Sequence, residues 1–206
     1  MTKAANRYAS EAGYNLIEMM IVLAVAGIVT GSAILQMNSS RPSLKGDGGL
    51  RVVMSQLNAA RELAITQRRN MQVTFTLGNK VEIFREKVGA EVLTTPPCVG
   101  AIVATGCLLS TTFIEGGVQF LFPTGTPTII DTPENFGKAS GVDFGSATEV
   151  KFNPDGMLVN QLGAVINGTV FVMIPGQRMS ARAVTVLGST GRVRGYKWDG
   201  ANWKLV

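Results

Sequence analysis

The sequence Gly13-Tyr14-Asn15-Leu16-Ile17-Glu18-Met19-Met20-Ile21-Val22-Leu23 begins a long apolar stretch and places one carboxylate just inside it. No charged residue occurs from Met19 to Ser40. Because a helix rises by about 1.5 Å per residue, this stretch and its uncharged flank reach across a hydrocarbon layer of about 30 Å. The sequence therefore predicts a membrane-spanning helix over residues 14–38.

Glu18 is the residue of this stretch that needs an explanation. An unpaired carboxylate costs about 2.5 kcal/mol or more at the centre of a bilayer and less near its surface. Its presence calls for a partner or a purpose. Lys3 and Arg7 precede the stretch and predict that the N-terminus stays in the cytoplasm, with the bulk of the chain beyond the membrane.

This N-terminus resembles that of a type IV prepilin or pseudopilin. The features that carry the resemblance are the short polar leader, Gly13, the aromatic Tyr14 and Glu18 at the lip of the apolar run; Tyr14 stands where phenylalanine is usual. The resemblance implies a leader over residues 1–13, cleavage between Gly13 and Tyr14 by the prepilin peptidase, and N-methylation of Tyr14. It also implies a role for Glu18 in subunit assembly, since its carboxylate would neutralise a neighbouring subunit's terminal amine.

Two other interpretations of the apolar stretch remain open. One is a secretory signal peptide, for which Gly31-Ser32-Ala33 would serve as the cleavage site; its apolar run is usually shorter, about 7–15 residues, and lacks an acid. The other is a plain membrane anchor with an incidental glutamate.

The composition argues against an enzyme. The chain has 206 residues and no histidine, so the commonest general base and zinc ligand are missing. Phosphate-binding loops, nucleophile elbows and paired-cysteine metal motifs are also absent from the sequence, so we expect no catalytic residue, no metal and no cofactor. Cys98 and Cys107 are candidates for a disulfide if the domain is periplasmic; two separate buried thiols are the alternative.

The rest of the chain predicts one soluble domain over residues 50–206. Residues 39–49 contain Pro42 and three glycines and predict a flexible break. The spacing of Leu50, Val53, Leu57, Ala60 and Ala64 predicts an amphipathic helix to Gln67. Alternation then predicts a hairpin over 71–77 and 81–85, and further strands over 118–122, 149–152, 158–161, 169–174, 183–187 and 192–198. Segments 86–116 and 123–148 carry no clear pattern.

These elements predict an α+β fold, with the N-terminal membrane helix followed by an amphipathic helix packed on an antiparallel sheet. The soluble part is also similar to the FimT/GspH class of minor pilins and pseudopilins. The similarity lies in the segments 57–65, 150–156 (Val-Lys-Phe-Asn-Pro-Asp-Gly) and 191–194 (Gly-Arg-Val-Arg). It implies a pilin-like fold.

The C-terminal segment is basic. Residues 177–206 hold six basic residues, Arg178, Arg182, Arg192, Arg194, Lys197 and Lys204, against Asp199, which indicates a negatively charged partner. In an extended 192–198 segment, Arg192, Arg194, Tyr196 and Trp198 share one face and Val193 points to the core. The candidate DNA-binding residues are Arg192, Arg194, Tyr196, Lys197 and Trp198. The segment 191–194 is similar to the G-R-x-R element of DNA-binding minor pilins. The alternative is the solvated side of a final, edge strand.

The sequence thus favours a minor pilin of a type IV pilus, placed near the filament tip and acting in assembly and DNA uptake. The alternatives are a minor pseudopilin of a type II secretion system and a membrane-anchored periplasmic binding module for a small ligand. The resemblance implies several partners: other pilins, the prepilin peptidase, an inner-membrane assembly platform and DNA. It also implies a single-pass inner-membrane protein with its C-terminal domain in the periplasm, which later enters a filament.

Overall fold

The computed structural model describes residues 15–76, 78–92, 98, 102–103, 106–123, 132–137, 140–147 and 149–206. The predicted leader and the predicted cleavage junction, Gly13 and Tyr14, lie outside these residues. The contacts divide the chain into two compact units, 1–40 and 41–206. This boundary falls within the segment predicted to separate the membrane helix from the soluble domain.

The prediction of a break over residues 39–49 was wrong. Helix α1 runs without interruption from Leu16 to Gln67, with Pro42 inside it. Two of the glycines have a packing role instead. A Cβ on Gly46 would overlap the carbonyl of Ser180, and one on Gly49 would lie 2.9 Å from a methyl carbon of Val118. The glycines therefore let the helix approach the sheet closely, and this packing compensates for their low helix propensity.

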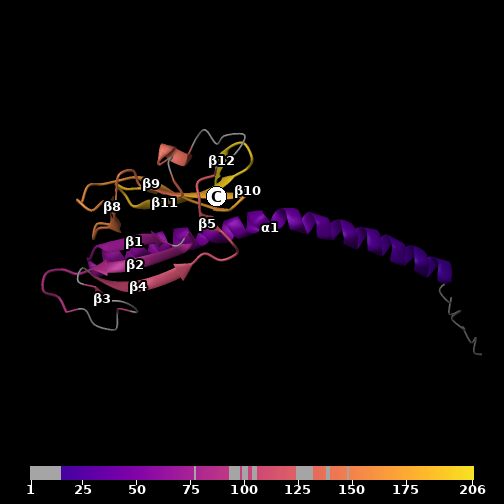
Figure 1. Cartoon of the computed structure of the whole chain (residues 1–206), viewed down its shortest axis with the longest axis horizontal. Coiled ribbons are helices and arrows are strands. Elements are labelled where there is room, and N and C mark those ends of the chain that lie inside the picture. The colour runs from indigo at the N-terminus through magenta and orange to yellow at the C-terminus, as the bar shows by residue number, and fades with distance from the viewer. Residues whose placement is uncertain are drawn as a thin grey trace, which may run out of the picture. The chain divides into compact units, whose positions relative to one another are not determined.

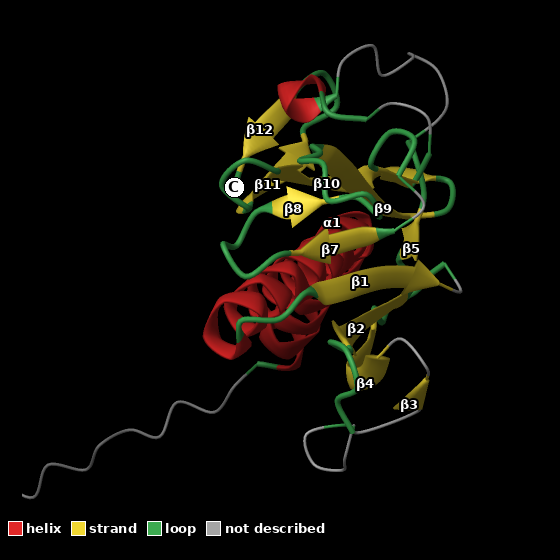
Figure 2. Cartoon of the chain, turned by 90° about the vertical axis from the view of Figure 1, so that its left-hand side faces the viewer, coloured by secondary structure: helices red, strands yellow, loops and turns green. Residues whose placement is uncertain are grey.

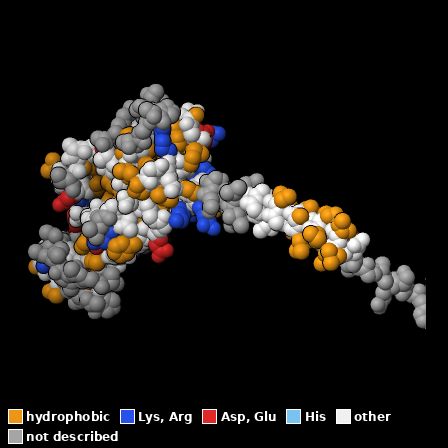
Figure 3. Space-filling model, turned by 45° about the vertical axis from the view of Figure 1, so that its right-hand side comes forward, with side chains coloured by type: hydrophobic (Ala, Val, Ile, Leu, Met, Phe, Trp, Pro, Cys, Tyr) orange, Lys and Arg blue, Asp and Glu red, His pale blue; other side chains and the backbone are white. Residues whose placement is uncertain are grey.

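The N-terminal part of α1 is apolar and exposed within the chain. Leu16–Ala33 has a mean hydropathy of 2.1, is long enough to cross a membrane, and has none of its residues buried against the described protein. In Figure 3 this part of the surface shows hydrophobic and uncharged atoms, whereas the Lys, Arg, Asp and Glu side chains in view belong to the unit 41–206. The coarse prediction of an apolar N-terminal helix is confirmed.

The C-terminal part of α1 is the predicted amphipathic helix. The five residues predicted to face the core are all at most 2% exposed: Leu50, Val53, Leu57, Ala60 and Ala64. The helix ends at Gln67, and Arg68 follows with a φ of 50°. The 3.6-residue period therefore identified the buried face correctly.

Two antiparallel sheets pack against the C-terminal part of α1 in the described part of the chain and leave one face of the helix uncovered (Figures 1 and 2). The first has the strand order β3 (Ile102–Val103), β4 (Gly106–Phe113), β2 (Lys80–Glu86), β1 (Met71–Thr76), β7 (Val150–Phe152) and β8 (Leu158–Val159). The second has the order β12 (Trp203–Leu205), β11 (Arg192–Trp198), β10 (Gln177–Leu187), β9 (Gly168–Ile174) and β5 (Gln119–Phe120), and β6 (Val142–Asp143) also pairs with β9. The α+β prediction is confirmed.

The predicted hairpin and the predicted later strands are all present, although several are shorter or longer than expected. The β1–β2 register pairs Met71 with Arg85 and Thr76 with Lys80. Strands β3, β4, β6 and β12 were not predicted. Of these, β4 forms a long ladder with β2, so part of the segment without a clear pattern is an integral strand.

One core joins the helix to both sheets. It contains Val73, Val81 and Ile83 from the first sheet together with Val170, Val172, Val184 and Val186 from the second. A smaller apolar cluster of Met173, Ala181 and Trp198 has Leu121 and Trp203 packed on it. The second sheet therefore buries apolar residues in two separate clusters.

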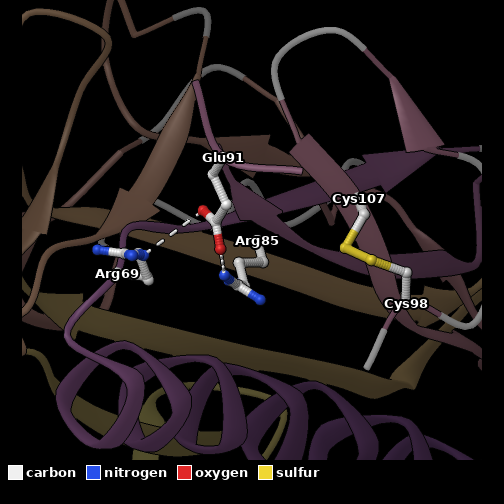
Figure 4. Close-up of a disulfide and its surroundings, with 5 residues drawn as sticks. All are labelled: Arg69, Arg85, Glu91, Cys98 and Cys107. Carbon is white, nitrogen blue, oxygen red and sulfur yellow. Dashed lines mark hydrogen bonds and ion pairs between the residues drawn. A yellow bond between two sulfur atoms is a disulfide. The ribbon is translucent and has the colours of Figure 1, made fainter. Parts of the chain in front are cut away.

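Cys98 and Cys107 form the predicted disulfide, with a Cα–Cα distance of 5.7 Å. Figure 4 shows the bridge and, nearby, the Glu91 carboxylate between the guanidinium groups of Arg69 and Arg85. A disulfide of this kind favours a location outside the cytoplasm. Together with the apolar helix, it supports an extracytoplasmic domain that follows a membrane anchor or a signal sequence.

Candidate functional site

Glu18 lies in the first turn of α1, where the structure gives it a local environment that the sequence analysis did not consider. The side-chain Oδ1 of Asn15 accepts a hydrogen bond from the amide of Ile17 at 3.3 Å. Asn15 therefore caps the helix, and Glu18 follows three residues later. A carboxylate here also interacts favourably with the positive end of the helix dipole. Glu18 therefore stabilises the start of the helix, independently of the predicted role between subunits.

The C-terminal candidate site lies on β11, at the predicted bounds of residues 192–198. Val193 packs against the main core. A Cβ on Gly195 would lie 2.6 Å from the sulfur of Met54, so this position also faces the helix. Arg192 and Arg194 consequently lie on the opposite, outer face of the sheet, and each of their side chains is 41% exposed. The predicted alternation is confirmed.

The two arginines share one carboxylate that the sequence analysis did not identify. Arg192 Nη2 donates to Glu134 Oε1 at 2.8 Å, and Arg194 Nη1 donates to the same oxygen at 3.0 Å. The hydroxyl of Thr185 donates to Glu134 Oε2 at 2.9 Å. Glu134 belongs to the short 3₁₀ element η1 (Pro133–Asn135), which lies over the outer face of β10. Thus an acidic side chain already occupies the candidate basic site.

The aromatic part of the predicted face is less accessible than expected. Trp198 is only 6% exposed, and its ring lies 5.3 Å from that of Trp203 in an edge-on arrangement. Tyr196 is half-buried. Lys197 alternates to the other face and pairs in register with Lys204 of β12. Strand β12 pairs with residues 196–198 of β11, so this part of β11 does not lie at the edge of the sheet, contrary to the alternative interpretation. Arg192 and Arg194 do lie on the solvated side of the strand, as that interpretation also expected.

Gly191 of the Gly-Arg-Val-Arg segment has a structural role. Its φ is +62°, and a Cβ there would overlap the carbonyl oxygen of Gly156 and lie 2.7 Å from Arg61 Nε. Arg61 Nε also donates to that carbonyl at 3.2 Å. The three segments on which the resemblance to minor pilins was based therefore meet at one place, around the Asn153–Gly156 turn.

Arg182 is a structural residue, although it contributed to the predicted basic segment. Its side chain is completely buried, and Nε donates to Asp47 Oδ1 at 2.6 Å. Its remaining donors reach the backbone carbonyls of Ser43, Met179 and Ala181. The guanidinium therefore ties α1 to β10 and is unavailable to a partner.

Internal pairing reduces the positive potential of the whole segment. Acidic partners pair with Arg182, Arg192, Arg194 and Lys204. Backbone hydrogen bonds, first from Asn202, together with Lys204, hold the pKa of Asp199 well below its usual value, and the same pair raises the pKa of Lys204. Only part of the formal +5 charge of residues 177–206 is therefore available for attraction of an anionic partner.

Sequence reasoning missed Glu134 and Thr185. Thr185 pairs directly with Arg194 in the β10–β11 ladder, so a register for the two predicted strands would have placed it beside the arginines. Glu134 lies in the segment without a clear pattern, and no sequence signal connects it with β11.

The comparisons with known proteins identify no relative. Neither a protein-family model, nor a curated protein, nor a solved structure matches this chain.

Proposed function

We propose that this protein is a minor pilin of a type IV pilus. The leader peptide is removed after Gly13, the apolar helix holds the subunit in the membrane, and the same helix then packs into the filament core. The globular unit remains at the filament surface, near the tip. The proposal gives the chain a structural role in assembly and no catalytic one.

The observation that carries the proposal is the exposed apolar helix with its acid in the first turn. Eighteen residues from Leu16 to Ala33 are unburied by the described chain and need an apolar environment, either lipid or other helices. Glu18 lies at the start of that surface, where a carboxylate suits a neighbouring subunit's terminal amine. The apolar segment and the core residues from Leu50 onward belong to the same helix, α1.

The mature N-terminus tests this proposal directly. Mass spectrometry of protein recovered from cells with an active prepilin peptidase is expected to show an N-methylated chain that starts at Tyr14. An intact Met1 start in such cells would contradict the proposal, and so would cleavage after Ala33, which instead indicates a signal peptide.

The role of Glu18 needs a separate experiment. Glu18→Ala should leave leader cleavage intact and reduce incorporation into filaments by at least tenfold, measured by immunoblotting of sheared pili. Glu62→Ala removes an exposed acid from the folded part of the same helix and is the matched control. Incorporation of both variants at the same level would exclude the assembly role of Glu18.

A minor pseudopilin of a type II secretion system remains the alternative, because it uses the same kind of stem and a similar domain. A deletion strain separates the two functions. Loss of pili with normal protein secretion supports the pilin, whereas loss of secretion with normal piliation supports the pseudopilin.

DNA contact is a second proposed function, and the geometry of β11 favours it. Arg192 and Arg194 point to one side and converge on a single anionic oxygen, which is the arrangement that binds a phosphate. We expect the full-length protein in a nonionic detergent to bind a labelled duplex, with an affinity that falls steeply as salt rises.

The double variant Arg192→Gln/Arg194→Gln tests this contact. Loss of two phosphate contacts should reduce the salt slope by about 1.8, and fluorescence anisotropy measures it. Arg41→Gln/Arg51→Gln removes the same charge from exposed positions on α1 and serves as the control. An equal loss in both variants would contradict a site on β11.

A further inference from the structure

The hydrogen-bond donors on the outer face of β10 and β11 form a complete oxyanion site. The Thr185 hydroxyl and the guanidinium groups of Arg192 and Arg194 all point to one carboxylate, at distances of 2.8–3.0 Å. Thr185 is fully buried, while both arginine side chains remain 41% exposed. The site therefore has a fixed inner donor and two outer donors that solvent can reach.

The residue that fills this site is held in an unfavourable backbone conformation. Glu134 has a φ of 56° and a ψ of 10°, and the next residue, Asn135, has a φ of 57°. Left-handed backbone is uncommon for a glutamate, and it persists only where surrounding contacts stabilise it. The three hydrogen bonds to the carboxylate are such contacts. The backbone strain indicates that this carboxylate is placed for the site rather than by local preference.

We infer that Thr185, Arg192 and Arg194 form a phosphate-binding site and that the Glu134 carboxylate is its built-in competitor. A carboxylate and a phosphodiester both offer oxygens to guanidinium groups, so one excludes the other. A DNA backbone phosphate must displace Glu134 before it gains both arginines. The chain thereby weakens its own affinity for DNA.

The inference rests on the proposed DNA contact, and Glu134→Gln is the variant that tests it. Glutamine keeps the size and an acceptor oxygen but removes the competing charge. We expect this variant of the full-length protein to bind duplex DNA about tenfold more tightly than the unmodified chain. Glu149→Gln is the matched control, because it removes an exposed, paired glutamate near the first sheet. The control should change the affinity by less than about twofold.

A second measurement separates this inference from the DNA proposal. Inorganic phosphate, added at constant ionic strength against chloride, should raise the unfolding midpoint of Glu134→Gln by more than it raises that of the unmodified chain, because a ligand stabilises the folded state that binds it. Adding Arg192→Gln/Arg194→Gln to Glu134→Gln should remove both the phosphate response and the gain in DNA affinity.

Each result has one meaning. If Glu134→Gln and Glu149→Gln bind DNA equally well while the arginine variant loses binding, the competitor role is wrong and the DNA contact stands. If no variant binds DNA but phosphate stabilises Glu134→Gln selectively, the oxyanion site stands and DNA is not its ligand. If phosphate shifts the midpoints of Glu134→Gln and the unmodified chain equally, the site itself is wrong.

Discussion

The two faces of the second sheet use arginine for opposite purposes. On the face toward α1, the Arg182 guanidinium is completely buried, and its partners are Asp47 and backbone carbonyls. On the outer face, Arg192 and Arg194 keep 41% of their side-chain surface and share Glu134. All three arginines belong to the hairpin of β10 and β11, and their acidic partners come from α1 and η1. Burial decides which of them stabilises the fold.

This difference shows why a count of basic residues misjudges a binding surface. A buried guanidinium must keep every hydrogen bond, since an unpaired buried charge is very costly. An exposed guanidinium exchanges its partner for water or another anion at little cost. Only the outer arginines can therefore change partner. Variants on the two faces should separate stability from binding.

The largest effect is expected from Arg182→Met. The substitution leaves Asp47 and three backbone carbonyls without their donor, and should lower the free energy of unfolding by about 3–5 kcal/mol. The only two tryptophans of the chain, Trp198 and Trp203, lie in the folded unit. Their fluorescence during denaturation in nonionic detergent measures the change.

Asp47→Asn controls for the charge of the partner. Because 30% of the Asp47 side chain is exposed, water can replace part of its interaction with Arg182. The free energy of unfolding should therefore fall by clearly less than it does for Arg182→Met. If Arg182→Met were as stable as the unmodified chain, the buried arginine would not hold the helix to the sheet.

Gly191→Ala should have the next largest effect. A Cβ would overlap the Gly156 carbonyl and crowd Arg61, so we expect a loss of about 1–3 kcal/mol in the free energy of unfolding. Gly163→Ala also has a positive φ, of +80°, but nothing lies within 4 Å of its Cβ. The same denaturation experiment on both variants separates crowding from backbone strain; equal losses would mean that the contact with Gly156 is unimportant.

Arg192→Gln/Arg194→Gln should change stability by less than about 1 kcal/mol while it weakens DNA binding. The two ion pairs are accessible to solvent and are screened by salt. Denaturation and anisotropy measured on the same preparation check this contrast. A large loss of stability would show that the outer arginines hold the fold as Arg182 does.

The smallest effect is expected from Asp199→Asn, in the turn between β11 and β12. The pKa of Asp199 is lowered in the folded state, so its ionised form stabilises the turn above the unfolded pKa of about 3.9, and this contribution is lost as the pH falls through the lower folded value. At neutral pH the variant should unfold at a slightly lower denaturant concentration than the unmodified chain. The difference should disappear in strong acid, and a difference independent of pH would rule out this cause.

Periodicity predicted the regular parts of the fold well. Leu50 to Ala64 and the hairpin from Met71 follow strong patterns, because burial on one face imposes a period on the sequence. The continuous helix through Pro42 was missed because its glycines serve contacts with residues more than 60 positions away, such as Ser180. Local propensity gives no information about such contacts.

The candidate site was only partly predictable for the same reason. Alternation placed Arg192, Arg194 and Val193 on their correct faces, and the prediction of a disulfide was also confirmed. Glu134 was unpredictable, because it meets β11 only through the fold and is separated from Arg192 by 58 residues. The burial of Arg182 and Trp198 likewise depends on elements far away in the chain.

The joint between Asp47 and Arg182 has a mechanical consequence. In the proposed pilin role, a subunit is drawn out of the bilayer by its helix. A pull on α1 at Arg41 then reaches the folded unit at Ser43 and Asp47, which the Arg182 guanidinium ties to β10. The load would then be shared between this ion pair and the close contacts of Gly46 and Gly49, before it reaches the hydrophobic residues from Leu50 onward. The ion pair between Arg182 and Asp47 would keep α1 attached to the sheets while the N-terminal part of the helix is pulled.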